Sequence, residues 1–331
     1  MGAGIHHIVS VSGGKDSTAT YCLAIERGRP FRAVFADTGN EHPATYEAVN
    51  TLHLKTGGPQ VEWVKADFSR QIAGKRSFIE KNWERHGVPA DIVERALAVL
   101  RPTGIPFLDL CLWKGRFPSR RAQFCTQELK VTPIDTTVTR PLLATGATVI
   151  SWQGVRAAES LARRDLPPLQ RLESHHDLPG RLYAYRPLLR VESVDEVFAI
   201  ARRHGVEPNP LYGWGLKRVG CFPCINCSKN ELALVDRLFP DQVERLEEWE
   251  RLVSEASKRG HSTFFNVVND PIMRAEWEAL EQAGALPTDL HNHGFGVRRM
   301  IEWAKTDRGG RQYSLLARDI ATVCSQWGAC E

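Results

Sequence analysis

The stretch Ile8-Val9-Ser10-Val11-Ser12-Gly13-Gly14-Lys15-Asp16-Ser17 decides the fold of this chain. Its first four residues are an apolar, β-branched run typical of a strand, and a helical pattern follows from Thr18 to Arg27. The two glycines between them let the backbone approach a ligand closely. A helix N-terminus offers free N–H groups and a partial positive charge. The junction therefore predicts a cradle for a phosphate or pyrophosphate, the alternative being a tight turn that binds nothing.

The side chains of this loop also suit an anion. Lys15 supplies a positive charge, and Ser12 and Ser17 supply hydroxyl donors. The loop matches neither the Walker A pattern nor the Gly-x-Gly-x-x-Gly pattern of dinucleotide-binding folds. The residues that we expect to bind the phosphates are Ser12, Gly13, Gly14, Lys15, Asp16 and Ser17.

Four further apolar runs have the pattern of strands, namely Phe31–Asp37, Val61–Val64, Thr148–Trp152 and Leu182–Tyr185. Helical patterns such as Pro43–Leu54 alternate with strands, which predicts an α/β fold with a doubly wound, mostly parallel sheet. Ligands of such sheets bind at the carboxyl ends of the strands, so Asp37 and Thr38 should share the pocket of the glycine loop. Asp37 can accept a hydrogen bond from a ribose hydroxyl or adenine amine, help to bind Mg²⁺, or cap a turn.

The chain has 331 residues, of which 42% are hydrophobic and 25% charged, as is ordinary for a globular protein. We expect a nucleotide-binding domain over residues 1–232, with an insertion at about 68–118, and a helical region over 233–331. No apolar run approaches the roughly 18 residues of a membrane helix, and the N-terminus lacks the features of a signal peptide. We therefore expect a cytoplasmic protein that does not use a membrane, and its net charge of +4 suits an anionic ligand.

Helical patterns also cover Asp91–Leu100 in the insertion and, in the C-terminal region, Asp241–Lys258, Pro271–Gly284 and Val297–Lys305. The C-terminal region is rich in aromatic and basic side chains, which either contact nucleic acid or form a core face with a charged rim. These residues are Trp277, Arg298, Arg299, Trp303, Lys305, Arg308 and Arg311.

The cysteines give a second signal. The run Cys221-Phe-Pro-Cys224-Ile-Asn-Cys227 places three thiols in one short loop, which suits a metal ion or an iron–sulfur cluster. Cys125 is the leading candidate for a fourth ligand. Four cysteines fit either a [4Fe–4S] cluster or structural Zn²⁺, and their spacing does not separate the two. By contrast, Cys22 lies at helical spacing with apolar neighbours and is expected in the core.

Ser12–Ser17 resembles the PP-loop, Ser-Gly-Gly-x-Asp-Ser, of the N-type ATP pyrophosphatases. Those enzymes cleave ATP between its α and β phosphates. The resemblance implies that this chain binds ATP with Mg²⁺ and releases AMP and pyrophosphate.

Later stretches resemble, in the same order, the motifs of the phosphoadenosine phosphosulfate (PAPS) reductase family. They are Cys125-Thr126 with Leu129-Lys130 and Pro133, Gly154-Val-Arg156-Ala-Ala-Glu159-Ser160 with Arg163, Arg186-Pro187-Leu188, Asn209-Pro210-Leu211-Tyr212 and Gly220-Cys221. The resemblance implies catalytic roles for Lys15, Asp16 and Arg156. Arg156 and Arg163 would each offer a guanidinium fork to phosphate oxygens.

Two departures favour one branch of the family. Sulfonucleotide reductases carry a degenerate phosphate loop, whereas Ser12–Ser17 is intact. They also end in a Glu-Cys-Gly tail with the nucleophilic cysteine, whereas this chain ends Cys324-Ser-Gln-Trp-Gly-Ala-Cys330-Glu331. The chain is therefore more similar to sulfur-transfer members such as the ATP-cleaving protein of DNA phosphorothioation systems.

This resemblance implies an enzyme that cleaves ATP and takes part in sulfur transfer to a nucleic acid or nucleoside. A cysteine desulfurase or another donor would supply the sulfur. One alternative is a sulfonucleotide (PAPS or APS) reductase that releases sulfite and uses Cys330. Another, of a different class, is a non-catalytic binding subunit with a zinc knuckle.

Overall fold

A computed structural model describes residues 4–265, 270–284 and 296–308. These residues form two compact units, the first made of 4–66 and 126–222 and the second of 67–125 and 223–308. The segment expected as an insertion is thus grouped with the C-terminal helices, and the chain passes into the second unit after residue 222. Each unit is described by itself.

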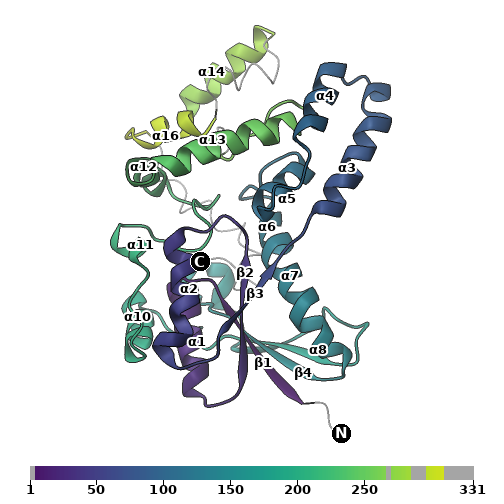
Figure 1. The fold of residues 1–331 in the computed structure, drawn as a ribbon. Helices are drawn as coiled ribbons and strands as arrows, with labels where there is room; N and C mark the ends of the chain where they lie inside the picture. The colour runs from purple at the N-terminus through teal and green to yellow at the C-terminus, as the bar shows by residue number, and fades with distance from the viewer. Residues whose placement is uncertain (1–3, 266–269, 285–295, 309–331) are drawn as a thin grey trace. The chain divides into compact units, whose positions relative to one another are not determined.

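The first unit contains a six-stranded sheet in the order β3-β2-β1-β4-β6-β5 (Figure 1). All neighbouring strands are parallel except β5 and β6, which are antiparallel. The predicted α/β fold is therefore confirmed, and all five predicted strands are present. The strands are β1 (Ile5–Val11), β2 (Phe31–Asp37), β3 (Val61–Lys65), β4 (Thr148–Trp152), β5 (Leu169–Leu172) and β6 (Arg181–Tyr185).

Helices cover both faces of this sheet (Figure 1). On one face, α1, α2 and α10 bury a core that includes Val9, Cys22 and Leu52. On the other face, a core that includes Ile8 and Leu143 packs under α7 and α8. The helices of this unit outside residues 124–144 are α1 (Lys15–Glu26), α2 (Pro43–Thr56), a 3₁₀ turn (Ala157–Glu159), α9 (Leu161–Arg164), α10 (Val194–Arg203) and α11 (Pro210–Gly213).

One helical run that the sequence analysis did not assign covers residues 124–144. It consists of α6 (Phe124–Thr126), a π-helical turn (Gln127–Val131), α7 (Thr132–Ile134), a second π-helical turn (Asp135–Thr139) and α8 (Arg140–Ala144). Each π-helical turn lies just before a proline, Pro133 or Pro141. A proline lacks the N–H of the helical bond and crowds the carbonyl four residues earlier, and the wider π turn gives this carbonyl room.

The second unit is helical and confirms the helices predicted near 91–100, 241–258, 271–284 and 297–305. Within it, Trp249 of α13 stacks on Phe107 of α5 with ring centroids 5.6 Å apart. The helices are α3 (Ser69–Asn82), a 3₁₀ turn (Glu84–His86), α4 (Ala90–Val99), α5 (Pro106–Lys114), α12 (Lys229–Leu238), α13 (Pro240–Glu255), α14 (Pro271–Gln282) and α16 (Val297–Ala304).

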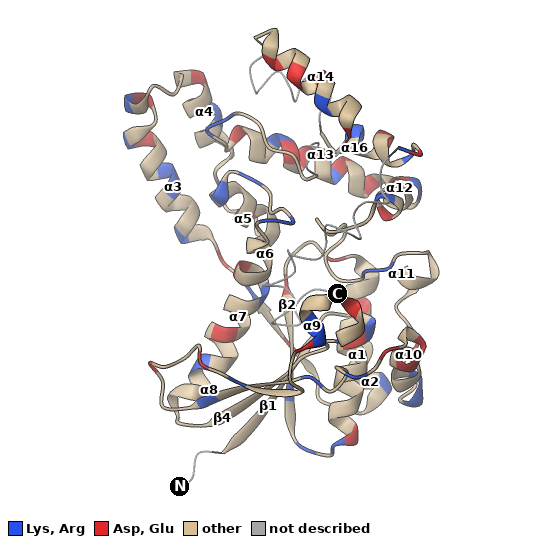
Figure 2. Ribbon diagram, turned by 180° about the vertical axis from the view of Figure 1, so that it is seen from behind, with Lys and Arg blue, Asp and Glu red and all other residues tan. Residues whose placement is uncertain are grey.

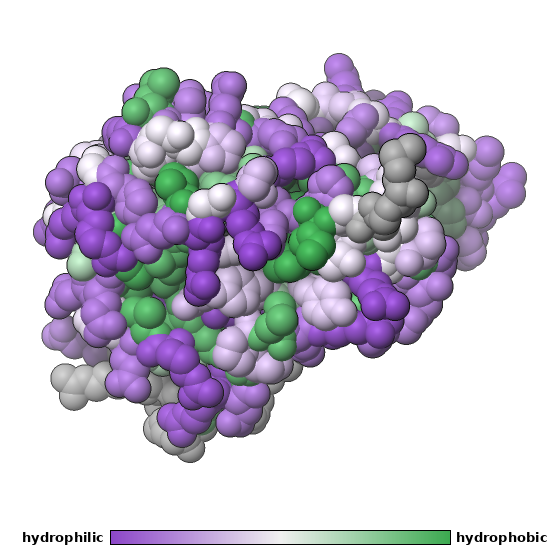
Figure 3. Space-filling view, turned by 90° about the horizontal axis from the view of Figure 1, so that it is seen from below, coloured by the Kyte–Doolittle hydropathy of each residue, from purple (hydrophilic) through white to green (hydrophobic). Residues whose placement is uncertain are grey.

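No helix among the described residues has the length and apolarity needed to cross a bilayer. On the surface seen from below, groups of hydrophobic side chains are interspersed with hydrophilic ones (Figure 3). Large hydrophobic side chains such as Ile5 and Leu54 are exposed at separate places in the sequence, as is common in folded proteins.

A buried carboxylate ties the second unit together. Glu250 is 1% exposed, and its two oxygens accept hydrogen bonds from the backbone N–H groups of Phe264 at 2.6 Å and Val297 at 2.7 Å. Val297 is the first residue of α16, so a side chain of α13 satisfies a free N–H at the start of another helix. Burial raises the pKa of Glu250 to about 7.

This pKa predicts a pH dependence of stability. Between pH 4.5 and about 7 the folded chain holds more protons at Glu250 than the unfolded chain, so stability falls as pH rises through this window. The full effect is roughly 3 kcal/mol. Urea unfolding at pH 5, 6, 7 and 8 should show this slope in the wild type and not in Glu250→Gln. Glu248→Gln, on the exposed side of α13, should retain it, and an unchanged slope in Glu250→Gln would contradict the assignment.

Candidate functional site

The sheet reverses its strand order between β1 and β4, because β2 follows on one side of β1 and β4 lies on the other. Ligands of doubly wound sheets bind outside the carboxyl ends of the strands at this switch point. The glycine loop follows β1, and the segment from Gln153 to Arg156 follows β4. The fold therefore brings two of the predicted motifs to the same edge of the sheet.

The glycine loop leads directly into α1. The helix begins at Lys15, three residues earlier than predicted, so the N–H groups of Lys15, Asp16 and Ser17 belong to its first turn. Gly13 has a φ of +76°, and a Cβ on it would lie 2.7 Å from Cγ2 of Thr45 in α2. A side chain at position 13 would thus be strained and would clash with α2.

Hydrogen bonds hold the loop in shape. The Ser12 N–H donates to Ser17 Oγ at 3.0 Å, and the Ser17 hydroxyl lies 3.1 Å from the Gly14 carbonyl oxygen, to which it can donate. The hydroxyls of Ser12 and Ser17 are 2.9 Å apart. Both predicted serines therefore support the loop geometry itself.

A segment from later in the chain, residues 209–212, contacts the glycine loop. The Lys15 N–H donates to the hydroxyl of Tyr212 at 2.9 Å, and the Asn209 amide lies within 3.4 Å of the Gly13 carbonyl oxygen. Asn209 also caps α11, because its side chain accepts from the Leu211 N–H at 3.1 Å. The Asn-Pro-Leu-Tyr run thus contacts the glycine loop through its first and its last residue.

A cluster of buried and half-buried charges begins within the loop. Asp16 is fully buried, with Oδ1 2.6 Å from Nε of Arg156 and Oδ2 2.7 Å from Nζ of Lys15. Arg156 also contacts Glu159 at 3.2 Å, and Arg163 pairs with the same carboxylate. The five side chains carry three positive and two negative formal charges. This excess of one positive charge favours an anionic ligand.

Gly154 allows these motifs to meet. A Cβ on it would lie 2.9 Å from the carbonyl carbon of Asp16 and 3.0 Å from the Ser17 nitrogen. Any side chain at position 154 would therefore push the loop after β4 away from the first turn of α1. The Gly-x-Arg spacing is thus a packing requirement that places Arg156 against Asp16.

The loop after β2 forms a second polar cluster. Asp37 accepts from the Gly39 N–H and from the Tyr46 hydroxyl, both at 2.9 Å, so it caps the turn that the sequence analysis considered. Thr38 is fully buried and donates from its hydroxyl to Oε1 of Glu41 at 2.6 Å.

Glu41 links this loop to the cysteine motif. It forms a backbone bridge with Cys221, and its Oε1 lies 3.8 Å from the Cys221 sulfur. Burial raises the pKa of Glu41 above its usual value, against the lowering effects of the Thr38 hydroxyl and the nearby Lys130 ammonium.

Sequence reasoning did not single out Glu41. Its only local signal is its position four residues after the end of β2, and the bridge to Cys221 spans 180 residues. Tyr212 and Asn209 appeared only as letters of a motif, because nothing local in the sequence shows that they contact the glycine loop.

The four predicted metal ligands fall in different units, Cys221 in the first and Cys125, Cys224 and Cys227 in the second. In the second unit, the Arg120 guanidinium donates to the Cys227 carbonyl oxygen at 3.4 Å, which brings the segment before Cys125 to the cysteine loop. Within the described ranges, no three His, Cys, Asp or Glu side chains are gathered to hold a metal ion. The four-cysteine site stays a prediction.

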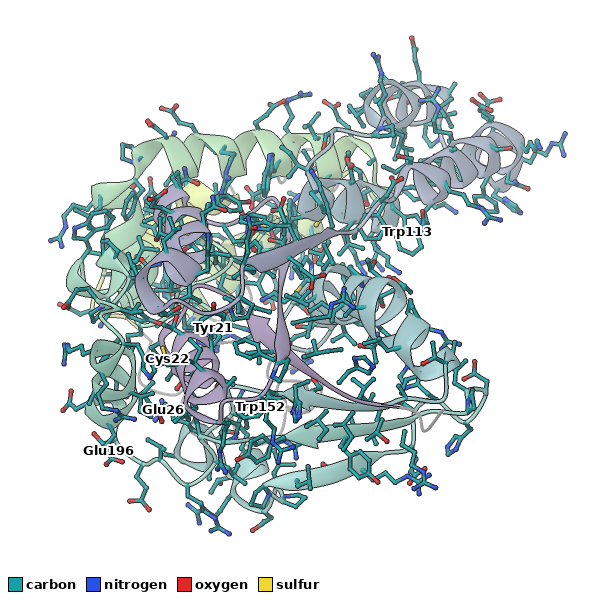
Figure 4. All side chains as sticks on the ribbon, turned by 60° about the horizontal axis from the view of Figure 1, so that its bottom comes forward. Tyr21, Cys22, Glu26, Trp113, Trp152 and Glu196 are labelled. Carbon is teal, nitrogen blue, oxygen red and sulfur yellow. The ribbon has the colours of Figure 1, made fainter. Side chains whose placement is uncertain are left out.

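Of the other four cysteines, Cys22 and Cys111 are buried. Cys22 lies buried on α1 beside Tyr21 (Figure 4), as predicted, and burial raises the pKa of its thiol to about 12, which makes it unreactive. Burial, with the charge of nearby Cys125, raises the pKa of the Cys111 thiol. Cys324 and Cys330 lie outside the described residues.

Comparison with known proteins defines the class. Residues 6–227 match the model of the phosphoadenosine phosphosulfate reductase domain, and the chain belongs to this family. The matched region contains the glycine loop, the Arg156 motif and the cysteine triplet.

Two relatives come from bacteriophages. An uncharacterized 37.8 kDa protein of the gpa 5′ region of Escherichia phage 186 is 47% identical over 337 residues, which covers 98% of this chain and 96% of that protein. An uncharacterized nin region protein of Escherichia phage lambda is 29% identical over 174 residues, covering 52% of this chain and 55% of that protein. Among solved structures, a PAPS reductase of Candida auris in complex with phosphate covers 67% of this chain and 82% of its own, with 18% identity and a TM-score of 0.38.

The Asp16–Arg156 pair should be essential to the stability of the first unit. Arg156→Met leaves the Asp16 carboxylate buried with Lys15 as its remaining cation, and we expect a loss of roughly 3 kcal/mol in urea unfolding. Adding Asp16→Asn removes the buried charge and should restore part of this loss. Arg32→Met breaks a half-exposed pair with Glu62 and should cost about 1 kcal/mol or less. Equal losses in Arg156→Met and Arg32→Met would contradict this view.

Proposed function

We propose that the chain is a PP-loop enzyme that cleaves ATP to AMP and pyrophosphate and takes part in sulfur transfer to a nucleic acid or nucleoside. The observation that carries the proposal is the intact glycine loop at the switch point, backed by a buried cluster with an excess of positive charge. Such a site favours a polyphosphate because the first-turn amides and the cations act on the same anion.

Each residue has a proposed role. The amides of Asp16 and Ser17 and the Lys15 ammonium would bind the β and γ phosphates. Arg156 would stabilise charge that develops at the α phosphate, and its contacts with Asp16 and Glu159 would hold its guanidinium in one orientation. Arg163 would act through Glu159, to which it is paired.

The loop after β2 would bind parts of the nucleotide other than the β and γ phosphates. Asp37 lies at the carboxyl end of β2, and its side chain is half-buried. With Thr38, it would contact the ribose or adenine or help to hold Mg²⁺, which neutralises phosphate charge when it is bound. The contact of Tyr46 with Asp37 keeps that carboxylate in place.

We also propose that Cys125, Cys221, Cys224 and Cys227 share one metal site, which would hold a [4Fe–4S] cluster, with Zn²⁺ as the alternative. The support is chemical, since four thiolates, three of them in one short loop, suit either group. The Glu41 contact with Cys221 would link this site to the nucleotide loop. The sulfur donor would be a cysteine desulfurase or another donor.

The first test concerns the loop. The wild type should release pyrophosphate and AMP from ATP, and Lys15→Ala should lower the rate about 10²-fold because a preorganised phosphate ligand is lost. Lys55→Ala, which removes an exposed lysine at the end of α2, should leave the rate unchanged. Release of ADP and orthophosphate would overturn the proposed cleavage.

The second test concerns the metal. After anaerobic purification, iron and acid-labile sulfide should be present in the wild type, with a broad visible absorbance band. Ser in place of any one of the four cysteines should lower the iron content, because each thiolate is a ligand. Cys22→Ala, which removes a buried core thiol, should retain the iron. Zinc without iron would favour the alternative metal, and full iron in Cys125→Ser would exclude Cys125, leaving Cys111 as the next candidate.

A second candidate function follows from the family itself, whose model is that of a PAPS reductase domain. In that case the chain would reduce PAPS with two electrons from thiols, releasing sulfite. Offering PAPS and a thiol reductant without ATP decides between the two. Sulfite release that is lost in Cys330→Ser would favour the reductase over the ATP-cleaving enzyme.

A further inference from the structure

The connection between α5 and α6 concentrates positive charge in the second unit. Residues 110–125 contain Lys114, Arg116, Arg120 and Arg121 and no acidic residue. In Figure 2 this connection carries blue ribbon and no red. The nearest preceding carboxylate, Asp109, accepts hydrogen bonds from the N–H groups of Thr103 and Gly104, so it already has partners before α5.

Two aromatic rings stand among the cations. Trp113, at the end of α5 (Figure 4), and Phe124, in α6, are both half-buried. Phe68 stacks on Trp113 with ring centroids 5.7 Å apart, which fixes the plane of the indole. The Lys114 ammonium lies 3.7 Å from the centre of the Trp113 ring, and the Arg116 guanidinium lies 5.5 Å from the centre of the Phe124 ring.

We infer that this surface, the Trp113–Phe124 platform, binds a single-stranded nucleic acid. Stacking rings beside a row of cations are the features that hold unpaired bases and their backbone. Lysine is a flexible point charge, so an incoming base can take the place of the Lys114 ammonium on Trp113 while the ammonium moves to a phosphate. Duplex DNA hides its base faces and cannot use the rings.

The inference rests on the proposed function for its biological meaning, since it makes the sulfur acceptor a polynucleotide strand. Cys125 directly follows Phe124, and Arg120 donates to the Cys227 carbonyl oxygen at 3.4 Å. A strand on the platform would therefore lie beside cysteines of the proposed metal site that belong to the same unit.

The cations of α16 and the residues after it are poorer candidates. Arg298 pairs with Glu247 at 2.6 Å, and Lys305 pairs with Asp236 at 2.6 Å. Arg299 and Arg308 also pair with carboxylates, and Trp303 is buried under the Lys229 ammonium. These contacts match the core-and-rim alternative for that region.

The test is fluorescence anisotropy of a labelled 20-nucleotide oligothymidylate with the full chain at several salt concentrations. Lys114→Gln with Arg116→Gln removes two phosphate contacts, so the salt slope should fall by about 1.4 and the affinity at 0.1 M salt by roughly 20-fold. Trp113→Leu, which keeps an apolar side chain against Phe68, should weaken binding about tenfold without changing the slope. Arg298→Gln with Arg299→Gln is the matched control with the same charge change and should bind like the wild type.

Equal loss in the two double variants, no loss in either, or equal binding of a duplex of the same length would overturn the inference. Pyrophosphate release from ATP is measured on the same samples. Binding without ATP cleavage would leave the platform standing and remove the proposed function. ATP cleavage without binding of the oligonucleotide would overturn the platform and leave the proposed function standing.

Discussion

The ion pair between Asp16 and Arg156 is the contact on which the candidate site depends. Both side chains are almost completely buried, and a charge in such a place is tolerated only when it has a partner. The pair joins the first turn of α1 to the segment after β4, across the point where the sheet reverses its order. Gly154 makes the close approach possible. The loop is thereby held in shape before any ligand arrives.

Within the first unit, the segment from Asn209 to Cys221 connects the glycine loop to the first cysteine of the cysteine motif. Its first part touches the glycine loop through Asn209 and Tyr212, and nine residues after Tyr212 the chain reaches Cys221 beside Glu41. The phosphate loop and the cysteine motif of this chain are thus joined by one short segment.

The sequence predicted most of the fold because its strands are short apolar runs bounded by glycine, proline or charged residues. It did not predict β5, whose Leu-Gln-Arg-Leu run is short and half-exposed at the edge of the sheet. The helical run at 124–144 was also missed, since Pro133 and Pro141 argue locally against a helix. In both cases pairing with the rest of the unit outweighed the local preference.

What the sequence by itself determined is the chemistry of the loop: its glycines, its cation and its position between a strand and a helix are all local. Only the tertiary structure decided the partners of those groups. It placed Arg156 on Asp16, Tyr212 on the Lys15 amide and Glu41 beside Cys221, contacts that span about 140 to 197 residues. Motif spacing gives the order of such residues along the chain. Which side chains meet depends on strand order and on the packing of buried charges, which no local pattern encodes.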